Sequence, residues 1–220
     1  MAKISAIITA AGKNSRMEKD QLKKKLPIKN KLLLPLHNRT LIENTINNVL
    51  SSNINECIIV LGHFSDEIEK IILNIDDDRI QIVKNNPIEV GLSQSLLNGI
   101  NKSNGEIVLC VAGDQPSVSK STYNNIIDCI LNSKFSEKTI SILRRRKIGL
   151  LKTVKGLGMP FAANKIQLAK YLENENDNLN PILKKMFENG FIFFAIKEEN
   201  EYELININRH EDYNLILNNL

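Results

Sequence analysis

The sequence contains no tryptophan, and aromatic residues make up only 5% of its 220 residues. A buried core therefore has to be built mainly from isoleucine, leucine and valine. A chain of this length fits one large domain, which buries roughly 70% of the surface that the unfolded chain exposes. We predict a single domain over residues 1–220 that needs no disulfide or metal to hold its fold together.

Cysteine is also scarce, with Cys57, Cys110 and Cys129 far apart in the chain. There is no CxxC pair among them. Since Cys57 and Cys110 stand inside apolar runs, we expect buried thiols.

No apolar run approaches the length of roughly 20 residues that spans a bilayer, and the start of the sequence lacks a signal-peptide pattern. We therefore predict a cytoplasmic protein with no membrane partner. The net charge of +4 and the pI of about 8.9 suit an anionic ligand. The total charge alone does not indicate a nucleic-acid binder, which would need its basic residues gathered along one face, so we predict no nucleic-acid partner.

Two nucleotide-binding motifs are missing as well. No GxGxxG follows the first predicted strand, and no acidic residue ends the second one at Leu61-Gly62, which disfavours a dinucleotide-binding oxidoreductase. The GxxxxGK[ST] motif of phosphate-binding loops is absent too.

The pattern of apolar residues predicts strands and helices in alternation, hence βαβ units on a mostly parallel, doubly wound sheet with helices on both faces. Thr40 and Glu43 have the spacing of a capping box, which we expect at the start of one helix. The strands are expected at 3–10, 56–61, 80–83, 106–111, 139–143, 191–196 and 202–207. The helices are expected at 40–50, 65–73, 93–100, 121–131, 164–173, 181–189 and from 211, with residues 18–30 irregular.

Ligands of open α/β sheets bind beyond the carboxyl ends of the strands, so the loops after Ala10, Val111 and Ile207 are the candidate sites. In the first loop, the small residues Ala10, Ala11 and Gly12 let backbone N–H groups approach phosphate oxygens, and Arg16 adds a planar cation. A plain glycine turn with a solvated arginine fits the same residues.

Lys31 precedes the apolar run Leu32 to Leu36, which anchors the base of its side chain and makes it a good phosphate ligand. Asp114 ends a buried strand at Gly113-Asp114-Gln115-Pro116, where a phosphate-bound Mg²⁺ needs an oxygen ligand. A turn-capping aspartate is the alternative interpretation.

Other polar residues give weaker signals. Gly91, Ser93 and Ser95 lie at the start of a predicted helix, whose N-terminus and hydroxyls are placed to contact a base or ribose, although ordinary capping explains Ser93 equally well. The three histidines, His37, His63 and His210, have no ligand or triad spacing. The arginines at 144–146 are candidate contacts to a second substrate or part of a solvated face.

With these residues in view, the chain resembles the molybdenum cofactor cytidylyltransferase group of the MobA-like nucleotidyltransferases. The similar motifs come in the same order: TAAGKNSRM from Thr9, KLLLPL from Lys31, GLSQSLLNG from Gly91, VAGDQPSV around Asp114, and NINRHEDY from Asn206. The resemblance implies a Rossmann-like fold and a Mg²⁺-dependent attack of a substrate phosphate on the α-phosphate of a triphosphate, with release of pyrophosphate.

Specific roles follow from that resemblance. It makes Arg16, Lys31 and Asp114 the catalytic residues and Asp114 the principal Mg²⁺ ligand, with Asn208 as a carboxamide at the second metal position. The TAAG form of the first loop goes with CTP, so the implied reaction moves CMP from CTP to a phosphorylated small molecule, molybdopterin among the candidates.

The chain also departs from the group in ways that leave other functions open. Asn14 replaces the usual serine, Glu18 replaces a glycine, and a lysine-rich insertion at about 18–30 alters the side where the acceptor is expected. A sugar-phosphate or polyol-phosphate nucleotidyltransferase fits the same residues. A non-catalytic nucleotide-binding protein is the third candidate, because Asn208 stands where a carboxylate is usual.

Overall fold

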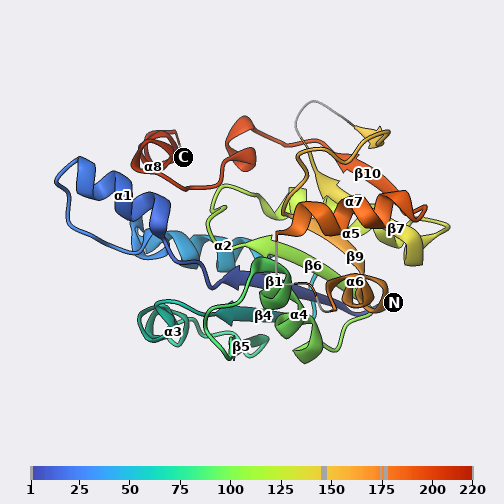
Figure 1. Ribbon diagram of the computed structural model, residues 1–220, viewed down its shortest axis with the longest axis horizontal. Helices are drawn as coiled ribbons and strands as arrows, with labels where there is room; N and C mark the ends of the chain where they lie inside the picture. Colours follow the sequence, from blue (N-terminus) through green and yellow to red (C-terminus); the bar gives the residue numbers. More distant parts are fainter. Residues whose placement is uncertain (1, 145–147, 174, 176–177, 220) are drawn as a thin grey trace.

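A computed structural model describes residues 2–144, 148–173, 175 and 178–219, and eight of the strands in these residues form one central sheet (Figure 1). The order of the strands across the sheet is β5-β4-β1-β6-β9-β7-β10-β8. Their bounds are β1 Ile4–Ala10, β4 Glu56–Leu61, β5 Ile80–Lys84, β6 Ile107–Ala112, β7 Thr139–Leu143, β8 Gly149–Leu150, β9 Phe161–Asn164 and β10 Ile192–Ile196. A separate hairpin pairs β2, Pro35–Leu36, with β3, Arg39–Thr40.

The sheet is mostly parallel and reverses its winding direction beside β1. From β1 the chain moves outward to β4 and β5, and it then returns to place β6 on the other side of β1. All these neighbours are parallel, whereas β9 runs antiparallel to both β6 and β7. The carboxyl ends of β1 and β6 therefore lie together at a topological switch point, where open α/β sheets bind ligands.

Helices cover both faces of the sheet, as the alternation of the sequence predicts. Their bounds are α1 Ser15–Lys23, α2 Leu41–Leu50, α3 Ser65–Ile72, α4 Leu92–Lys102, α5 Lys120–Leu131, α6 Lys165–Leu172, α7 Leu179–Glu188 and α8 His210–Leu217. The short 3₁₀ helices are η1 Lys31–Leu33, η2 Ser136–Lys138 and η3 Glu201–Leu204. None of the helices in these described residues is both long and apolar enough to cross a membrane.

The alternation of side chains along β1 divides the core between the two faces. Ile8 and its neighbours at even positions pack with α2, α3 and α5, while Ile7 packs with α4 on the opposite face, in the layer that also contains α6 and α7. A smaller apolar cluster joins α1 and α8 to the hairpin through residues such as Met17, Leu36 and Ile216. Figure 1 shows α1 and α8 side by side at one end of the molecule.

The predicted aliphatic core and its buried thiols are confirmed. Isoleucine, leucine and valine make up most of the buried side chains, with Tyr123, Phe161 and Phe193 among the largest of them. Cys57 and Cys110 are fully buried, and burial raises the pKa of the Cys57 thiol to about 12. Neither buried thiol is a reactive nucleophile at neutral pH.

Helix α2 begins with the predicted capping box. The Thr40 hydroxyl accepts a hydrogen bond from the Glu43 N–H at 3.3 Å, and the Glu43 carboxylate accepts one from the Thr40 N–H at 2.6 Å. Two otherwise unpaired N–H groups at the start of the helix are satisfied in this way.

The irregular segment expected at 18–30 was wrong in its first part, since α1 continues to Lys23. Met17 and Gln21 are the buried residues of this helix, and they provide a single turn of inward-facing side chains. So short an amphipathic pattern among lysines gives little helical signal in the sequence.

The strand expected at 202–207 was also wrong, because a 3₁₀ helix, η3, occupies its first half. Glu203 is fully buried there, and its carboxylate accepts hydrogen bonds from the Ser119 N–H, the Thr122 hydroxyl and the Glu199 N–H. These bonds turn the chain away from the sheet. Strand β9 was not predicted, because its residues, FAAN, show too little alternation.

Candidate active site

The loop after β1 is shaped by Asn14, which precedes α1 with a left-handed backbone conformation (φ 60°). Asparagine tolerates this conformation better than most residues. Its side-chain amide donates to the Lys29 carbonyl at 3.0 Å and accepts from the Lys31 N–H at 3.1 Å. Asn14, which replaces the usual serine, therefore ties the first loop to the residue predicted to bind phosphate.

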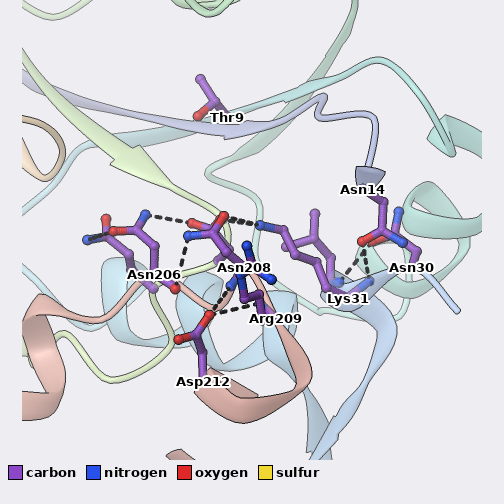
Figure 2. A network of polar contacts seen from close by, with 12 residues as sticks. Thr9, Asn14, Asn30, Lys31, Asn206, Asn208, Arg209 and Asp212 are labelled. Atoms are coloured by element: carbon purple, nitrogen blue, oxygen red, sulfur yellow. Dashed lines mark hydrogen bonds and ion pairs between the residues drawn. The ribbon is translucent and has the colours of Figure 1, made fainter. Parts of the chain in front are cut away.

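Lys31 is fixed at its backbone, and its side chain extends to the loop after β6. Asn30 caps the short helix η1 by accepting a hydrogen bond from the Leu32 N–H at 2.9 Å, and Leu32 is buried in the core. The Lys31 ammonium group donates to Asp114 Oδ2 at 2.5 Å and to Asn208 Oδ1 at 3.3 Å. Figure 2 shows Lys31 extending from Asn14 and Asn30 towards Asn208.

Asp114 reaches the site because Gly113 lets the loop after β6 pass close to the end of β1. The Gly113 N–H donates to the Thr9 carbonyl at 3.0 Å, and a Cβ at this position would lie 3.1 Å from that oxygen. A larger residue at position 113 would push the loop away. The Asp114 side chain is only 15% exposed, and Lys31, its partner, is 17% exposed.

The segment between η3 and α8 brings two asparagines to the same place. The Asp114 carbonyl accepts from the Ile207 N–H at 3.0 Å, and Asn206 donates from its side chain to Asp114 Oδ1 at 2.9 Å. Asp212 accepts from the Asn208 N–H at 2.9 Å and the Arg209 N–H at 2.8 Å, which fixes the start of α8 (Figure 2).

Further bonds attach α8 to the rest of the site. The His210 N–H donates to the Asp20 carboxylate of α1 at 2.9 Å, and this bond is the main reason why the pKa of Asp20 is lowered. The Tyr213 hydroxyl donates to the Pro35 carbonyl of the hairpin at 2.6 Å. Helix α8 is thus hydrogen-bonded to both α1 and the hairpin of β2 and β3.

Ser95 and Ser93 of α4 have different surroundings. The Ser95 hydroxyl accepts a hydrogen bond from the Asn85 amide at 2.9 Å and donates to the Gly91 carbonyl at 3.1 Å. Ser95 also lines a cavity at the carboxyl ends of β1 and β6. The Ser93 hydroxyl donates to the Glu175 carbonyl at 2.9 Å. Among the residues that the structure describes, the lining of that cavity includes neither Ser93 nor Gly91.

A cavity of about 490 Å³ opens at the switch point and joins these elements. Its size falls in the range of small-molecule sites. Two cations, Arg16 and Lys31, and one anion, Asp114, line it, so the described lining is net positive. The lining residues are Thr9, Ala10, Ala11, Gly12, Asn14, Arg16, Asn30, Lys31, Leu32, Val90, Leu92, Ser95, Ala112, Asp114, Met159, Asn206 and Asn208.

The structure thus brings most of the sequence-predicted site residues together, with Gly91 and Ser93 outside the lining. Sequence reasoning missed Asn30 and Asn206 as site residues. The only signal for Asn206 was its place two residues before Asn208 in the NINRHEDY motif. Of the three arginines at 144–146, the last two lie outside the described residues, while Arg144 donates to the Lys155 carbonyl at 3.2 Å.

Similar proteins of known structure share this fold over nearly the whole chain. A nucleotidyl transferase from Methanothermobacter thermautotrophicus is 40% identical, with a TM-score of 0.91 over 98% of this chain and 96% of its own. A 4-diphosphocytidyl-2C-methyl-D-erythritol synthase from Anaerococcus prevotii shares the fold at 20% identity, with a TM-score of 0.73 over 99% of this chain and 95% of its own.

Curated relatives match a shorter region. The bifunctional protein GlmU of Francisella tularensis subsp. novicida is 28% identical over 125 residues, which are 57% of this chain. The match covers only 25% of the length of GlmU. The family of MobA-like NTP transferase domains matches residues 6–172, about three quarters of the chain, including the loop after β1, Lys31 and Asp114. The chain therefore belongs to the MobA-like NTP transferase domain family and is an enzyme of the nucleotidyltransferase type.

Proposed function

We propose that this nucleotidyltransferase uses Mg²⁺ to transfer CMP from CTP to a phosphorylated small molecule, releasing pyrophosphate. The observation that carries the proposal is the convergence of Arg16, Lys31 and Asp114 on the cavity beside Gly12. A triphosphate needs cations and backbone N–H groups, and its metal needs an oxygen ligand of opposite charge. One cavity supplies all three.

The side-chain oxygens around the Lys31 ammonium group are suitable ligands for Mg²⁺. Asp114 Oδ2 and Asn208 Oδ1 already converge on one positive group, the Lys31 ammonium, at 2.5 and 3.3 Å. Proteins often hold Mg²⁺ with one or two carboxylates and complete its shell with substrate phosphates and water. The described residues contain no group of three or more acidic, histidine or cysteine side chains that would bind a metal without such help. The bound metal would neutralise charge on the phosphates.

The reaction requires one bond to form and one to break. An oxygen of the acceptor phosphate attacks the α-phosphorus of the triphosphate, the bond from that phosphorus to the bridging oxygen breaks, and pyrophosphate leaves. Positioning and charge stabilisation account for most of the catalysis in such transfers. Arg16 and Lys31 bind the triphosphate oxygens in this proposal, and Gly12 leaves open space for them, since a Cβ there meets nothing within 4 Å.

The choice of CTP rests on the TAAG form of the first loop, Thr9 to Gly12. Ser95 lies on the part of the cavity formed by α4, which crosses over β1 and β4, and is placed to contact the base or ribose. The acceptor is a molybdopterin or, as the second candidate, a sugar or polyol phosphate. Pyrophosphate release measured with each of the four triphosphates, across a panel of phosphorylated acceptors, tests the proposal.

A non-catalytic nucleotide-binding role is the alternative function, because Asn206 and Asn208 leave Asp114 as the one carboxylate among the described lining residues. A protein of that kind binds CTP and releases no pyrophosphate with any acceptor. The same panel therefore separates the two functions.

The first prediction concerns the base. In the presence of Mg²⁺, CTP is expected to raise the unfolding temperature more than GTP does at equal concentration, because stabilisation grows with the ratio of ligand concentration to Kd. Differential scanning fluorimetry measures both shifts. A larger shift with GTP would contradict the assignment of CTP.

The second prediction concerns Arg16. Arg16→Lys keeps the charge and loses the planar pair of donors, so the Kd for CTP is expected to rise about tenfold. Arg39→Lys, at an exposed position of the hairpin, is the matched control and should bind CTP as the wild type does. Equal affinity of wild type and Arg16→Lys would place the phosphate site elsewhere.

A further inference from the structure

Two side-chain amides connect Asp114 to the backbone carbonyl of Met159, which also lines the cavity. Asn206 donates to Asp114 Oδ1 at 2.9 Å, and its own oxygen accepts from Gln115 Nε2 at 3.3 Å. The same Gln115 nitrogen donates to the Met159 carbonyl at 3.0 Å. Asp114 is thus held through a chain of hydrogen bonds that ends on the main chain before β9.

The direction of every bond in this chain is determined by its two ends. A carboxylate and a backbone carbonyl can only accept hydrogen bonds, so Asp114 requires the NH₂ group of Asn206 and Met159 requires the NH₂ group of Gln115. The oxygen of Asn206 then faces the Gln115 nitrogen. Each amide therefore has one orientation that satisfies its neighbours.

Asn206 and its neighbours are themselves held in place, so Asn206 can fix the orientation of the Asp114 carboxylate. Gln115 is only 2% exposed, and the Asn206 carbonyl accepts from the Asn208 side chain at 3.2 Å. The neighbouring Ile207 N–H is bonded to the Asp114 carbonyl. Oδ1 of Asp114 is therefore occupied by a neutral donor, and Oδ2 is the oxygen directed at the Lys31 ammonium.

We propose that Asn206, supported by Gln115, is a positioning residue that holds Asp114 with one oxygen, Oδ2, directed towards the metal. The inference rests on the proposed function of Asp114 as the Mg²⁺ ligand. Asn206 bonds Oδ1 without adding charge, so it orients the carboxylate rather than competing for the cation. Partners that orient metal ligands change metal affinity about 10- to 100-fold when they are removed.

The test compares the Kd for CTP measured by calorimetry in Mg²⁺ with the Kd measured in EDTA. Wild-type protein is expected to bind CTP at least about tenfold more tightly in Mg²⁺. The ratio of the Kd in EDTA to the Kd in Mg²⁺ should fall about tenfold, towards one, in Asn206→Leu, because Asp114 loses its orientation. The Kd in EDTA should stay within about twofold of wild type, since Arg16 and Lys31 keep their places.

Asn48→Leu is the matched control, since the Asn48 amide also makes two hydrogen bonds, to the carbonyls of Pro116 and Val118, outside the cavity. It should keep the wild-type ratio. Gln115→Leu is a second route to the same test, and we expect a smaller fall in the ratio because Asn206 keeps its direct bond to Asp114.

An unchanged ratio in Asn206→Leu, or in Gln115→Leu if the first variant does not fold, overturns the inference alone. A fall in affinity that is equal in Mg²⁺ and EDTA also overturns it, because Asn206 would then act on the nucleotide or on the fold. A wild-type protein whose CTP affinity ignores Mg²⁺ overturns the proposed metal role together with this inference.

Discussion

Asp114→Asn is expected to lower the rate of pyrophosphate release at least about 100-fold, since stabilisation by a bound metal is worth several kcal/mol in the transition state. The substitution keeps the shape of the side chain and removes the charge that attracts Mg²⁺. Both neighbours of the Asp114 carboxylate, Lys31 and Asn206, donate hydrogen bonds to it. An amide at position 114 can accept from only one of them without placing its own NH₂ group against a donor.

Asp128→Asn is the control for this variant, because Asp128 is exposed on α5 and lies outside the cavity. Circular dichroism checks that both proteins fold. A folded Asp114→Asn protein whose turnover at limiting Mg²⁺ stays within about threefold of wild type, far from the 100-fold fall expected on removing a metal ligand, would refute the metal assignment.

Lys31→Ala is expected to lower kcat/KM for CTP about 100-fold, since removing one preorganised donor to a developing negative charge costs about 10²–10³ in rate. In the structure the Lys31 ammonium lies 2.5 Å from Asp114 Oδ2. In our proposal, triphosphate oxygens replace this carboxylate as the partner of Lys31, which frees Oδ2 for the metal. Lys31 thus neutralises Asp114 in the free protein and phosphate in the complex.

Lys31→Ala and Asp114→Asn are expected to differ in how Mg²⁺ affects CTP binding, and this difference separates the role of Lys31 from that of Asp114. Lys31→Ala keeps Asp114, so Mg²⁺ should still tighten CTP binding, whereas Asp114→Asn should lose that effect. Lys70→Ala, at an exposed position on α3, is the control for the loss of a lysine. Wild-type kcat/KM in Lys31→Ala would show that another cation binds the triphosphate.

Local patterns in the sequence identified the architecture and half of the site. Strands such as 56–61 and 139–143 match the structure because a buried parallel strand is a short, continuous apolar run. Gly12 and Asp114, each two residues beyond the end of such a strand, could be placed at the carboxyl edge for the same reason. The capping box at Thr40 was equally local.

Local patterns could not identify residues whose environment is formed by distant parts of the chain. Glu203 was predicted as part of a strand at 202–207, yet it is fully buried and bonded to residues that lie more than 80 positions earlier, at Ser119 and Thr122. Ser93 and Ser95 look equivalent in the sequence. Two residues apart on a helix, they point in nearly opposite directions, so only Ser95 lines the cavity.

The sequence by itself determined the mostly parallel sheet, the loops at the carboxyl ends of its strands and the residue types that a triphosphate and a metal require, whereas the strand order that places the switch point beside β1 came from the structure. Only the tertiary structure decided which of them meet: Lys31 pairs with Asp114 across 83 positions and with Asn208 across 177. The physical reason is that hydrogen bonds form within about 3 Å, and such distances are fixed by packing. Here the apolar cluster between α1, the hairpin and α8 brings the segment of Asn206 and Asn208 to the end of β6, and no local pattern of residues encodes that contact.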